Sequence, residues 1–280
     1  MSRSARAAFR VTPAGPGSVD PRGKAVGPQD KEAAAGELAE LGERLDGLQE
    51  ALYAEAVGGG SRSLLLVLQG MDTSGKGGVI RHVAGLVNPQ GLAIASFKKP
   101  TEAERAQHFL QRVRAALPTA GRIGVFDRSH YEDVLIARVD ALVPEDVWRG
   151  RYAEIAAFEQ ELAASGTTVV KCMLHISPDE QAERLLARLD DPAKHWKYNP
   201  ADLDARGKWP AYQQAYADAV AHTDSDAAPW YVVPSDRKWY RNWAIASLLA
   251  ETLAELDPQF PRADLDVDAE RARIAAAVVA

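Results

Sequence analysis

The sequence predicts a three-layer α/β fold in which helices cover both faces of a parallel, five-stranded sheet. Short, uniformly apolar stretches are typical of strands buried on both sides, and they lie near residues 64–69, 92–97, 122–126, 168–176 and 230–233. Helical patterns lie between and after them, near residues 76–87, 102–116, 146–165, 178–189, 209–222 and 238–256. Strands that alternate with helices in this order form parallel sheets.

The composition is that of an ordinary globular protein, with 280 residues, of which 46% are apolar and 26% charged. The 33 basic and 39 acidic residues give a net charge of −6, which argues against a nucleic-acid coat. A local cationic patch could still bind a polyanion. Because no apolar stretch approaches the roughly 18 residues of a membrane span, we expect a cytoplasmic protein without a membrane or nucleic-acid partner.

The two ends of the chain differ from its centre. Residues 1–35 are rich in Ala, Gly, Pro and charge without apolar periodicity, so we expect a flexible, loosely attached arm. Residues 36–57 carry leucines every three or four positions, which predicts an amphipathic helix that packs within the chain or against a partner subunit. A single domain is expected over residues 36–258, followed by a C-terminal tail over residues 259–280.

A phosphate-binding loop, or P-loop, is predicted directly after the first strand. The pattern is Gly-x4-Gly-Lys between a buried strand and a helix, where backbone N–H groups and the helix N-terminus can form an anion cage. Lys76 adds a mobile positive charge. The alternative is a glycine-rich turn with an incidental lysine. The phosphate-binding candidates of the loop are Gly70, Gly75, Lys76, Gly77 and Gly78.

Two features of this loop depart from the usual pattern. Gly77 replaces the Ser or Thr whose hydroxyl ordinarily binds magnesium. Asp72 also places a carboxylate inside a cage built for anions, where it would repel a phosphate about 4 Å away by roughly 4 kcal/mol at an effective dielectric constant near 20. A cation between them would remove this repulsion, so we assign Asp72 to magnesium. The alternative is that Asp72 faces solvent.

A second carboxylate ends the predicted strand at 122–126. In parallel sheets ligands bind at the carboxyl ends of the strands, so Asp127 should share an edge with the P-loop. It is a candidate magnesium ligand or base, and Arg128 could hold a phosphate with its planar fork. His130 is expected to be structural, because direct phosphoryl transfer needs no covalent intermediate.

Residues 190–208 are polar, contain two prolines and lie between two predicted helices, as in an active-site lid. Arg188 and Lys197 are the preferred phosphate ligands of this region. Leu185 and Leu186, on the other face of their helix, are expected to point toward the core. The span from 184 to 208 contains six basic residues and four aspartates, so the alternative is a solvated face joined by salt bridges.

Three stretches, residues 70–78, 126–134 and 190–197, resemble the family 2 polyphosphate kinases, and the similarity extends in order over residues 36–258. This resemblance implies a P-loop kinase-like core with a helical or loop lid. It further implies phosphate transfer between polyphosphate and nucleotides, dependence on Mg²⁺ with Mn²⁺ as an alternative ion, and a homo-oligomer.

The resemblance also suggests roles for individual residues. The family's essential acidic and basic positions correspond to Asp72, Lys76, Asp127, Arg128 and Arg188. Lys98 falls on the polyphosphate path. Glu132 occupies a position that distinguishes subgroups, and residues 129–133 resemble the subgroup that phosphorylates both AMP and ADP. We also expect Arg81 and Lys194 to bind phosphate. Residues 105–112 lack two acidic side chains common in such sequences, which leaves the choice of acceptor open.

The function implied is in-line transfer of a phosphoryl group that converts AMP to ADP and ADP to ATP. Asp72 and Asp127 would hold magnesium, Lys76 and the P-loop would hold nucleotide phosphates, and Arg128, Arg188 and Lys197 would stabilise the transferring group. Two alternatives are an ATP-dependent nucleoside monophosphate kinase and a non-catalytic regulator that binds nucleotide or polyphosphate.

Overall fold

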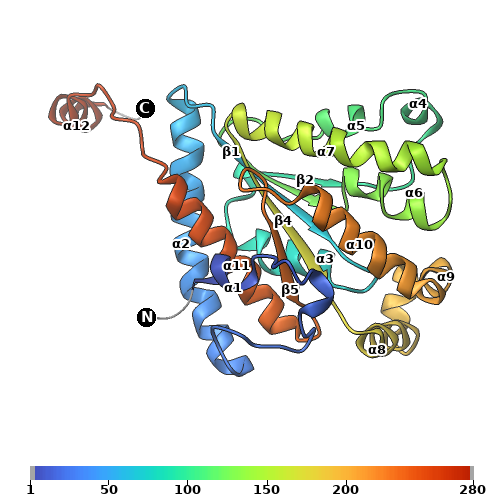
Figure 1. Cartoon of the computed structure of the whole chain (residues 1–280). Helices are drawn as coiled ribbons and strands as arrows, with labels where there is room; N and C mark the ends of the chain where they lie inside the picture. The colour runs from blue at the N-terminus through green and yellow to red at the C-terminus, as the bar shows by residue number, and fades with distance from the viewer. Residues whose placement is uncertain (1–3, 278–280) are drawn as a thin grey trace.

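The structure, a computed structural model, describes residues 4–277 and has the predicted parallel sheet at its centre (Figure 1). The strands are adjacent in the order β2-β3-β1-β4-β5, and every neighbouring pair is parallel. Their bounds are Ser63–Gln69 for β1, Leu92–Ser96 for β2, Ile123–Asp127 for β3, Thr167–His175 for β4 and Trp230–Pro234 for β5. The prediction of a five-stranded α/β fold is confirmed.

Alternating side chains of the strands pack against helices on opposite faces of the sheet. Leu64 and Leu66 of β1 belong to a core shared with α2 (Lys31–Val57) and α11 (Lys238–Leu256). Leu65 and Val67 face the opposite core, with α7 (Glu145–Ala164) and α10 (Trp209–Thr223). Figure 1 shows these two helical layers on either side of the strands.

The remaining helices are shorter. Residues 102–116, predicted as one helix, form two short helices separated by turns over residues 106–110. The segment 190–208 is more ordered than a loop, since it contains a 3₁₀ turn at Pro192–Lys197 and a helix. The helix bounds are Ala5–Phe9 for α1, Lys76–His82 for α3, Glu102–Arg105 for α4, Gln111–Arg114 for α5, Ile136–Val139 for α6, Pro178–Leu189 for α8, Ala201–Gly207 for α9 and Val267–Ala276 for α12.

The expectation of a loosely attached arm is wrong for residues 4–35. Phe9 of α1 is only 4% exposed and contacts the rings of Tyr240 and Trp243 edge-on, at centroid distances of 6.1 and 6.3 Å. The helix α2 begins at Lys31, capped by the side chain of Asp30. The sequence pattern missed this packing because α1 has only five residues, too few to show a helical period.

The N-terminal segment also covers one edge of the sheet. After α1, Arg10 forms an isolated antiparallel bridge with Tyr231 of β5. The next residue donates its backbone N–H to Trp230 O at 3.0 Å. The unpaired side of β5 is therefore partly occupied by a segment from the other end of the chain.

The C-terminal segment beyond α11 leads away from the body to α12, which has no buried residue (Figure 1). Residues 278–280 of the expected tail lie outside the described part of the chain. Leu186 of α8 is 59% exposed, so the expectation that it points toward the core is wrong, whereas its neighbour Leu185 is buried. Over residues 4–277, no helix is both long and apolar enough to cross a membrane.

Replacing Phe9 tests whether the N-terminal segment belongs to the core. We expect Phe9→Ala to lower the free energy of unfolding by about 3 kcal/mol, because it leaves a cavity among aromatic rings. The measurement is chemical denaturation followed by circular dichroism. Val57→Ala, at a side chain that is 78% exposed, is the matched control and should change the free energy by less than about 0.5 kcal/mol. Equal stabilities for both variants would contradict the packing of α1.

Candidate active site

The P-loop joins β1 to α3 in a turn that only glycine permits at two positions. Gly70 has φ 149° and Gly75 has φ 108°, both in the region that L-residues avoid. A Cβ atom at Gly70 would lie 2.6 Å from the carbonyl oxygen of Leu174, and one at Gly75 would lie 1.8 Å from Arg241 Nη1. The tight turn brings the N-terminus of α3 directly behind the loop, where its free N–H groups can bind an anion.

Lys76 is the first residue of α3 and lies buried under the loop. Its Nζ donates to Gly70 O at 2.8 Å. Burial lowers the pKa of Lys76, and the negative charge of Asp72 is the largest effect that opposes this, with Asp127 and Glu132 acting in the same direction. An anion bound in the loop would have the same sign of effect and would favour the charged ammonium.

Other groups in the loop also fit a bound phosphate or metal. The hydroxyl oxygens of Thr73 and Ser74 are buried and have no hydrogen-bond partner among the described residues. Gly77 faces open space, because a Cβ atom added there would have no neighbouring atom within 4 Å, whereas a Cβ at Gly78 would lie 2.7 Å from Arg241 Nη2. The loop therefore has unused polar groups on one side and close packing on the other.

Both predicted carboxylates lie close enough to the Lys76 ammonium for their charges to act on it. Asp127 ends β3 opposite Leu68 of β1, and the next residue donates its N–H to Leu68 O at 3.1 Å. Asp127 is also close enough to Lys76 to raise the pKa of its ammonium. Arg128 Nη2 lies 2.7 Å from Asp72 Oδ1. At this edge of the sheet, Asp127 and Arg128 thus lie close to Asp72 and Lys76 of the loop.

Arg128 and Glu132 extend the same alternation of charges. Burial opposes the charge of Arg128, but Glu132 and Asp72 outweigh it and raise the pKa of the guanidinium. Burial raises the pKa of Glu132, while Arg128 and Lys76 oppose the shift. With its oxygen toward Ser129, the side chain of Gln69 donates to Glu132 Oε1 at 3.1 Å. Each charge of the group is therefore held by neighbours of opposite sign.

The predicted phosphate ligands Arg188, Lys194 and Lys197 contact residues between 191 and 202. Arg188 Nη1 lies 3.1 Å from both Lys197 O and Asp202 Oδ2. Lys194 pairs with Asp191 at 2.7 Å, and the Lys197 ammonium lies 4.9 Å from the centroid of the Trp196 ring. These contacts match the salt-bridged alternative for Lys194. The structure thus does not bring Lys194 and Lys197 into contact with the P-loop.

One residue of the lid, Asp202, is nevertheless close enough to the P-loop for its charge to interact with that of Asp72. Burial raises the pKa of Asp202, and the charge of Asp72 adds to this effect. Of the other predicted ligands, Arg81 is exposed on α3 and Lys98 is exposed after β2. His130 is fully buried with Nε2 3.2 Å from Glu159 Oε1, which agrees with a structural role.

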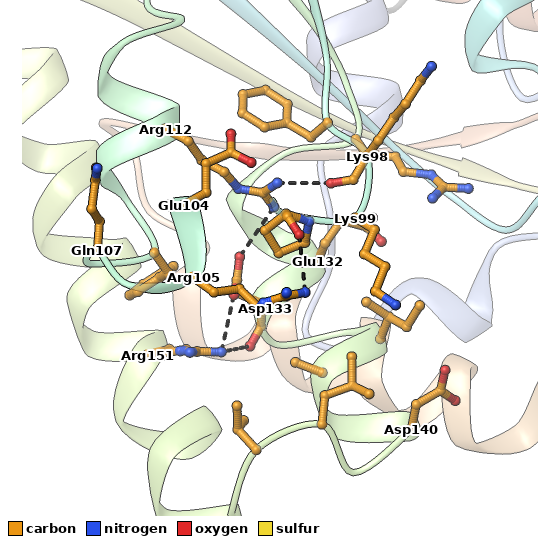
Figure 2. Close-up of a pocket in the computed structure, with 18 residues that line it drawn as sticks. Lys98, Lys99, Glu104, Arg105, Gln107, Arg112, Glu132, Asp133, Asp140 and Arg151 are labelled. Carbon is orange, nitrogen blue, oxygen red and sulfur yellow. Dashed lines mark hydrogen bonds and ion pairs between the residues drawn. The ribbon is translucent and has the colours of Figure 1, made fainter. Parts of the chain in front are cut away.

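A cavity of about 520 Å³ opens beside Arg128 and Glu132. Figure 2 shows Arg112 and Arg151 converging on Asp133, with the Arg151 Nη1 to Asp133 Oδ1 distance at 3.2 Å. The region that lacks two expected acidic side chains forms one wall. The cavity is lined by Phe97, Lys98, Lys99, Pro100, Glu104, Arg105, Gln107, Phe109, Arg112, Arg128, Glu132, Asp133, Ile136, Ala137, Asp140, Leu142, Val143 and Arg151.

Sequence reasoning missed three buried side chains that hold the P-loop from outside. Gln181, Arg184 and Arg241 each donate to a backbone carbonyl of residues 72–74. Burial lowers the pKa of Arg241 to about 10, and the nearby charge of Arg184 adds to this shift. In the sequence, Arg184 is recognisable only as part of a basic cluster, and no pattern indicates that Gln181 or Arg241 contacts the P-loop.

The sequence pattern of the family described as Polyphosphate kinase 2 matches residues 28–261. The chain belongs to this polyphosphate kinase 2 family. It is 48% identical to an AMP/ADP-polyphosphate phosphotransferase of Meiothermus ruber, and the match covers 91% of this chain and 95% of that relative. It is 45% identical to an ADP-polyphosphate phosphotransferase of Rhodopseudomonas palustris, over 78% of each chain.

A solved structure agrees with the fold of this polyphosphate kinase 2 family member. The crystal structure of polyphosphate kinase 2 from Arthrobacter aurescens superposes with a TM-score of 0.95 at 45% identity, over 98% of each chain. The sheet, both helical layers and the segments that carry the P-loop therefore follow an architecture seen in the family.

Two glycine substitutions in the P-loop of this polyphosphate kinase 2 test the packing around it. Gly75→Ala should destabilise the protein by about 2 kcal/mol or more, because its methyl group would overlap Arg241 and its φ is unfavourable for alanine. Gly77→Ala meets open space and should leave the unfolding transition nearly unchanged. Thermal denaturation of both variants makes the comparison, and equal midpoints would show that Arg241 does not press against the loop.

Proposed function

We propose that the chain transfers phosphoryl groups between inorganic polyphosphate and nucleoside mono- and diphosphates, converting AMP to ADP and ADP to ATP. The observation that carries this proposal is the joint placement of the P-loop, Asp72, Asp127 and Arg128 at one sheet edge. The proposal is supported by the extended identity to the AMP/ADP-polyphosphate phosphotransferase of Meiothermus ruber.

The P-loop binds phosphate groups through backbone and ammonium donors. The N–H groups at the start of α3 and the buried Lys76 ammonium supply positive charge, and burial strengthens the attraction of that ammonium for phosphate. The buried hydroxyls of Thr73 and Ser74 can donate to phosphate oxygens. These groups hold the two reacting phosphates in line rather than taking part in covalent chemistry.

The carboxylates Asp72 and Asp127 fit a bound Mg²⁺ ion, with Mn²⁺ as the alternative. Among residues 4–277, no group of three or more His, Cys, Asp or Glu side chains could hold an ion by itself. Magnesium suits such a site, because proteins commonly bind it through one or two carboxylates together with substrate phosphates and water. When bound, the ion would neutralise the phosphate charges and reduce their repulsion.

Arg128 changes partner when substrates bind. Its guanidinium pairs with Asp72 Oδ1 at 2.7 Å. A metal ion held by Asp72 would leave the planar fork free to bind a non-bridging oxygen of the transferring phosphoryl group. Arg188 and Lys197 reach the same group when the lid closes, and Asp127 orients the attacking phosphate oxygen, which is already ionised near neutral pH.

The cavity beside Glu132 accommodates the acceptor nucleotide. Its volume of about 520 Å³ and its mixture of aromatic and charged walls are typical of a small-molecule site. Arg105 and Gln107 of this wall lie in the stretch that departs from the family pattern, so they are candidates for setting the preference between AMP and ADP. Action in the cytoplasm, as a homo-oligomer, is part of the same proposal.

A direct assay tests the proposed activity. Purified protein incubated with ADP, long-chain polyphosphate and Mg²⁺ should form ATP without any other nucleoside triphosphate, and AMP should give ADP. Product formation is followed by chromatography. Formation of ADP from AMP only when ATP is supplied would instead identify an ATP-dependent nucleoside monophosphate kinase.

Replacing Asp127 distinguishes an enzyme from a binding protein. Asp127→Asn should reduce the rate of ATP formation by about 100-fold or more, because it removes a charge that orients the reacting phosphates. Asp146→Asn, at an exposed position of α7, is the control and should keep the wild-type rate. Unchanged turnover in Asp127→Asn would contradict the role given to this carboxylate.

The buried Lys76 ammonium should give the reaction an alkaline limit. Burial lowers its pKa in the free protein, so kcat/KM for ADP should fall as the pH rises through a value below the ordinary lysine pKa of about 10.4. Bound phosphates raise this pKa again, so kcat should stay constant to a higher pH. Lys76→Arg, which stays charged, should lose this limit in whatever activity it retains. The same alkaline limb in Lys76→Arg would assign it to another group.

A further inference from the structure

The carbonyl oxygens of residues 70–74 in the P-loop all accept hydrogen bonds from side chains. Lys76 Nζ binds the carbonyls of residues 70 and 71, at 2.8 and 3.5 Å. Gln181 Nε2 donates to Asp72 O at 3.1 Å, and Arg184 Nη1 donates to the carbonyls of residues 73 and 74 at 2.8 and 3.1 Å. A carbonyl oxygen facing the phosphate site would repel an anion. These donors therefore fix the loop with its N–H groups toward the ligand.

Arg184 uses all three nitrogens of its guanidinium in this arrangement. Nε donates to Glu180 Oε1 at 2.7 Å, Nη1 holds the loop, and Nη2 donates to Ser235 O at 2.6 Å and Asp236 O at 3.0 Å. The side chain is 8% exposed. Five donors in a rigid, planar fork are specific to arginine, so a lysine could not make the same set of contacts.

Gln181 connects the same loop to the lid. It is fully buried, and while its nitrogen holds Asp72 O, its Oε1 accepts from Arg206 Nη1 of α9 at 3.2 Å. Farther along α8, Arg188 pairs with Asp202, which also belongs to α9. Figure 1 shows α8 and α9 together at one end of the molecule. Helix α8 is thus attached to the P-loop on one side and to the lid on the other.

We propose that Gln181 and Arg184 are positioning residues that couple the binding of phosphate in the P-loop to the position of the lid. A phosphate that draws the N–H groups of the loop inward also displaces the carbonyls of residues 72–74. Those carbonyls are bound to α8, whose Gln181 and Arg188 side chains in turn contact Arg206 and Asp202 of α9. The coupling is reciprocal, so a placed lid strengthens phosphate binding. The proposal rests on the nucleotide-binding function given above.

The substitution Gln181→Met tests this coupling. Methionine keeps the length of the side chain but makes neither hydrogen bond. With the wild-type protein, saturating ADP and Mg²⁺ should slow amide hydrogen exchange over residues 190–208. In Gln181→Met this protection should fall by at least half, and the Kd for ADP, measured by calorimetry, should rise about fivefold or more, the lower range of typical allosteric couplings.

Three further variants make the outcome decisive. Arg184→Lys keeps the charge but not the fork, so its Kd for ADP should rise about tenfold. Gln181→Glu can still accept from Arg206 but cannot donate to Asp72 O, so it should lose lid protection as well. Glu183→Gln, at an exposed position of the same helix, should behave as wild type. A purely structural role would lower the midpoint of thermal unfolding without changing the ADP-dependent protection.

The result that overturns the proposal is wild-type ADP affinity and wild-type lid protection in Gln181→Met, Gln181→Glu and Arg184→Lys. If the wild-type protein forms ATP from ADP and polyphosphate while these variants keep full protection, the coupling alone is wrong. If the wild-type protein binds ADP and protects the lid but forms no ATP, while the variants lose that protection, the proposed activity is wrong and the coupling stands.

Discussion

The phosphate site depends on the direction of the peptide groups between β1 and α3. A cage for anions forms only if successive N–H groups point inward, and the carbonyl oxygens must then point outward and find donors inside the protein. The chain supplies these donors from three separate places: Lys76 from within the loop, Gln181 and Arg184 from α8, and Arg241 from α11. Tertiary packing thus holds a loop conformation that its own sequence only permits.

A second constraint is the compensation of charge at the same sheet edge. The charges alternate in sign along the series Lys76, Asp72, Arg128 and Glu132. For the three of these residues other than Asp72, burial has the largest effect on the pKa and disfavours the charged form, and neighbours of opposite charge counteract it. Such a group tolerates the arrival of a highly charged substrate, because each side chain can exchange its internal partner for a phosphate or a metal ion. The contacts among these four side chains and the proposed contacts with substrate therefore belong to one electrostatic network.

Much of this site could be predicted from short sequence patterns. The strands are rich in apolar residues, the P-loop has its characteristic spacing, and Asp127 is the last residue of a strand whose carboxyl end lies beside the loop. The parts that could not be predicted depend on distant backbone. Gln181 and Arg241 bind carbonyl oxygens 109 and 167 residues away in the chain, and a carbonyl acceptor is present at every residue. The partners of Arg188 and Lys197 depend on where the lid lies, which no local pattern specifies.

The contact between Arg10 and Tyr231 has a consequence for how the molecule behaves in crowded solution. The outer side of β5 would otherwise offer unpaired peptide groups to any extended polypeptide, as exposed sheet edges do in aggregation and strand exchange. The N-terminal segment pairs with part of that edge and so blocks access to it. It is anchored by the Phe9 ring and pairs its own backbone with β5, so this edge of the sheet is partly covered from within the same chain.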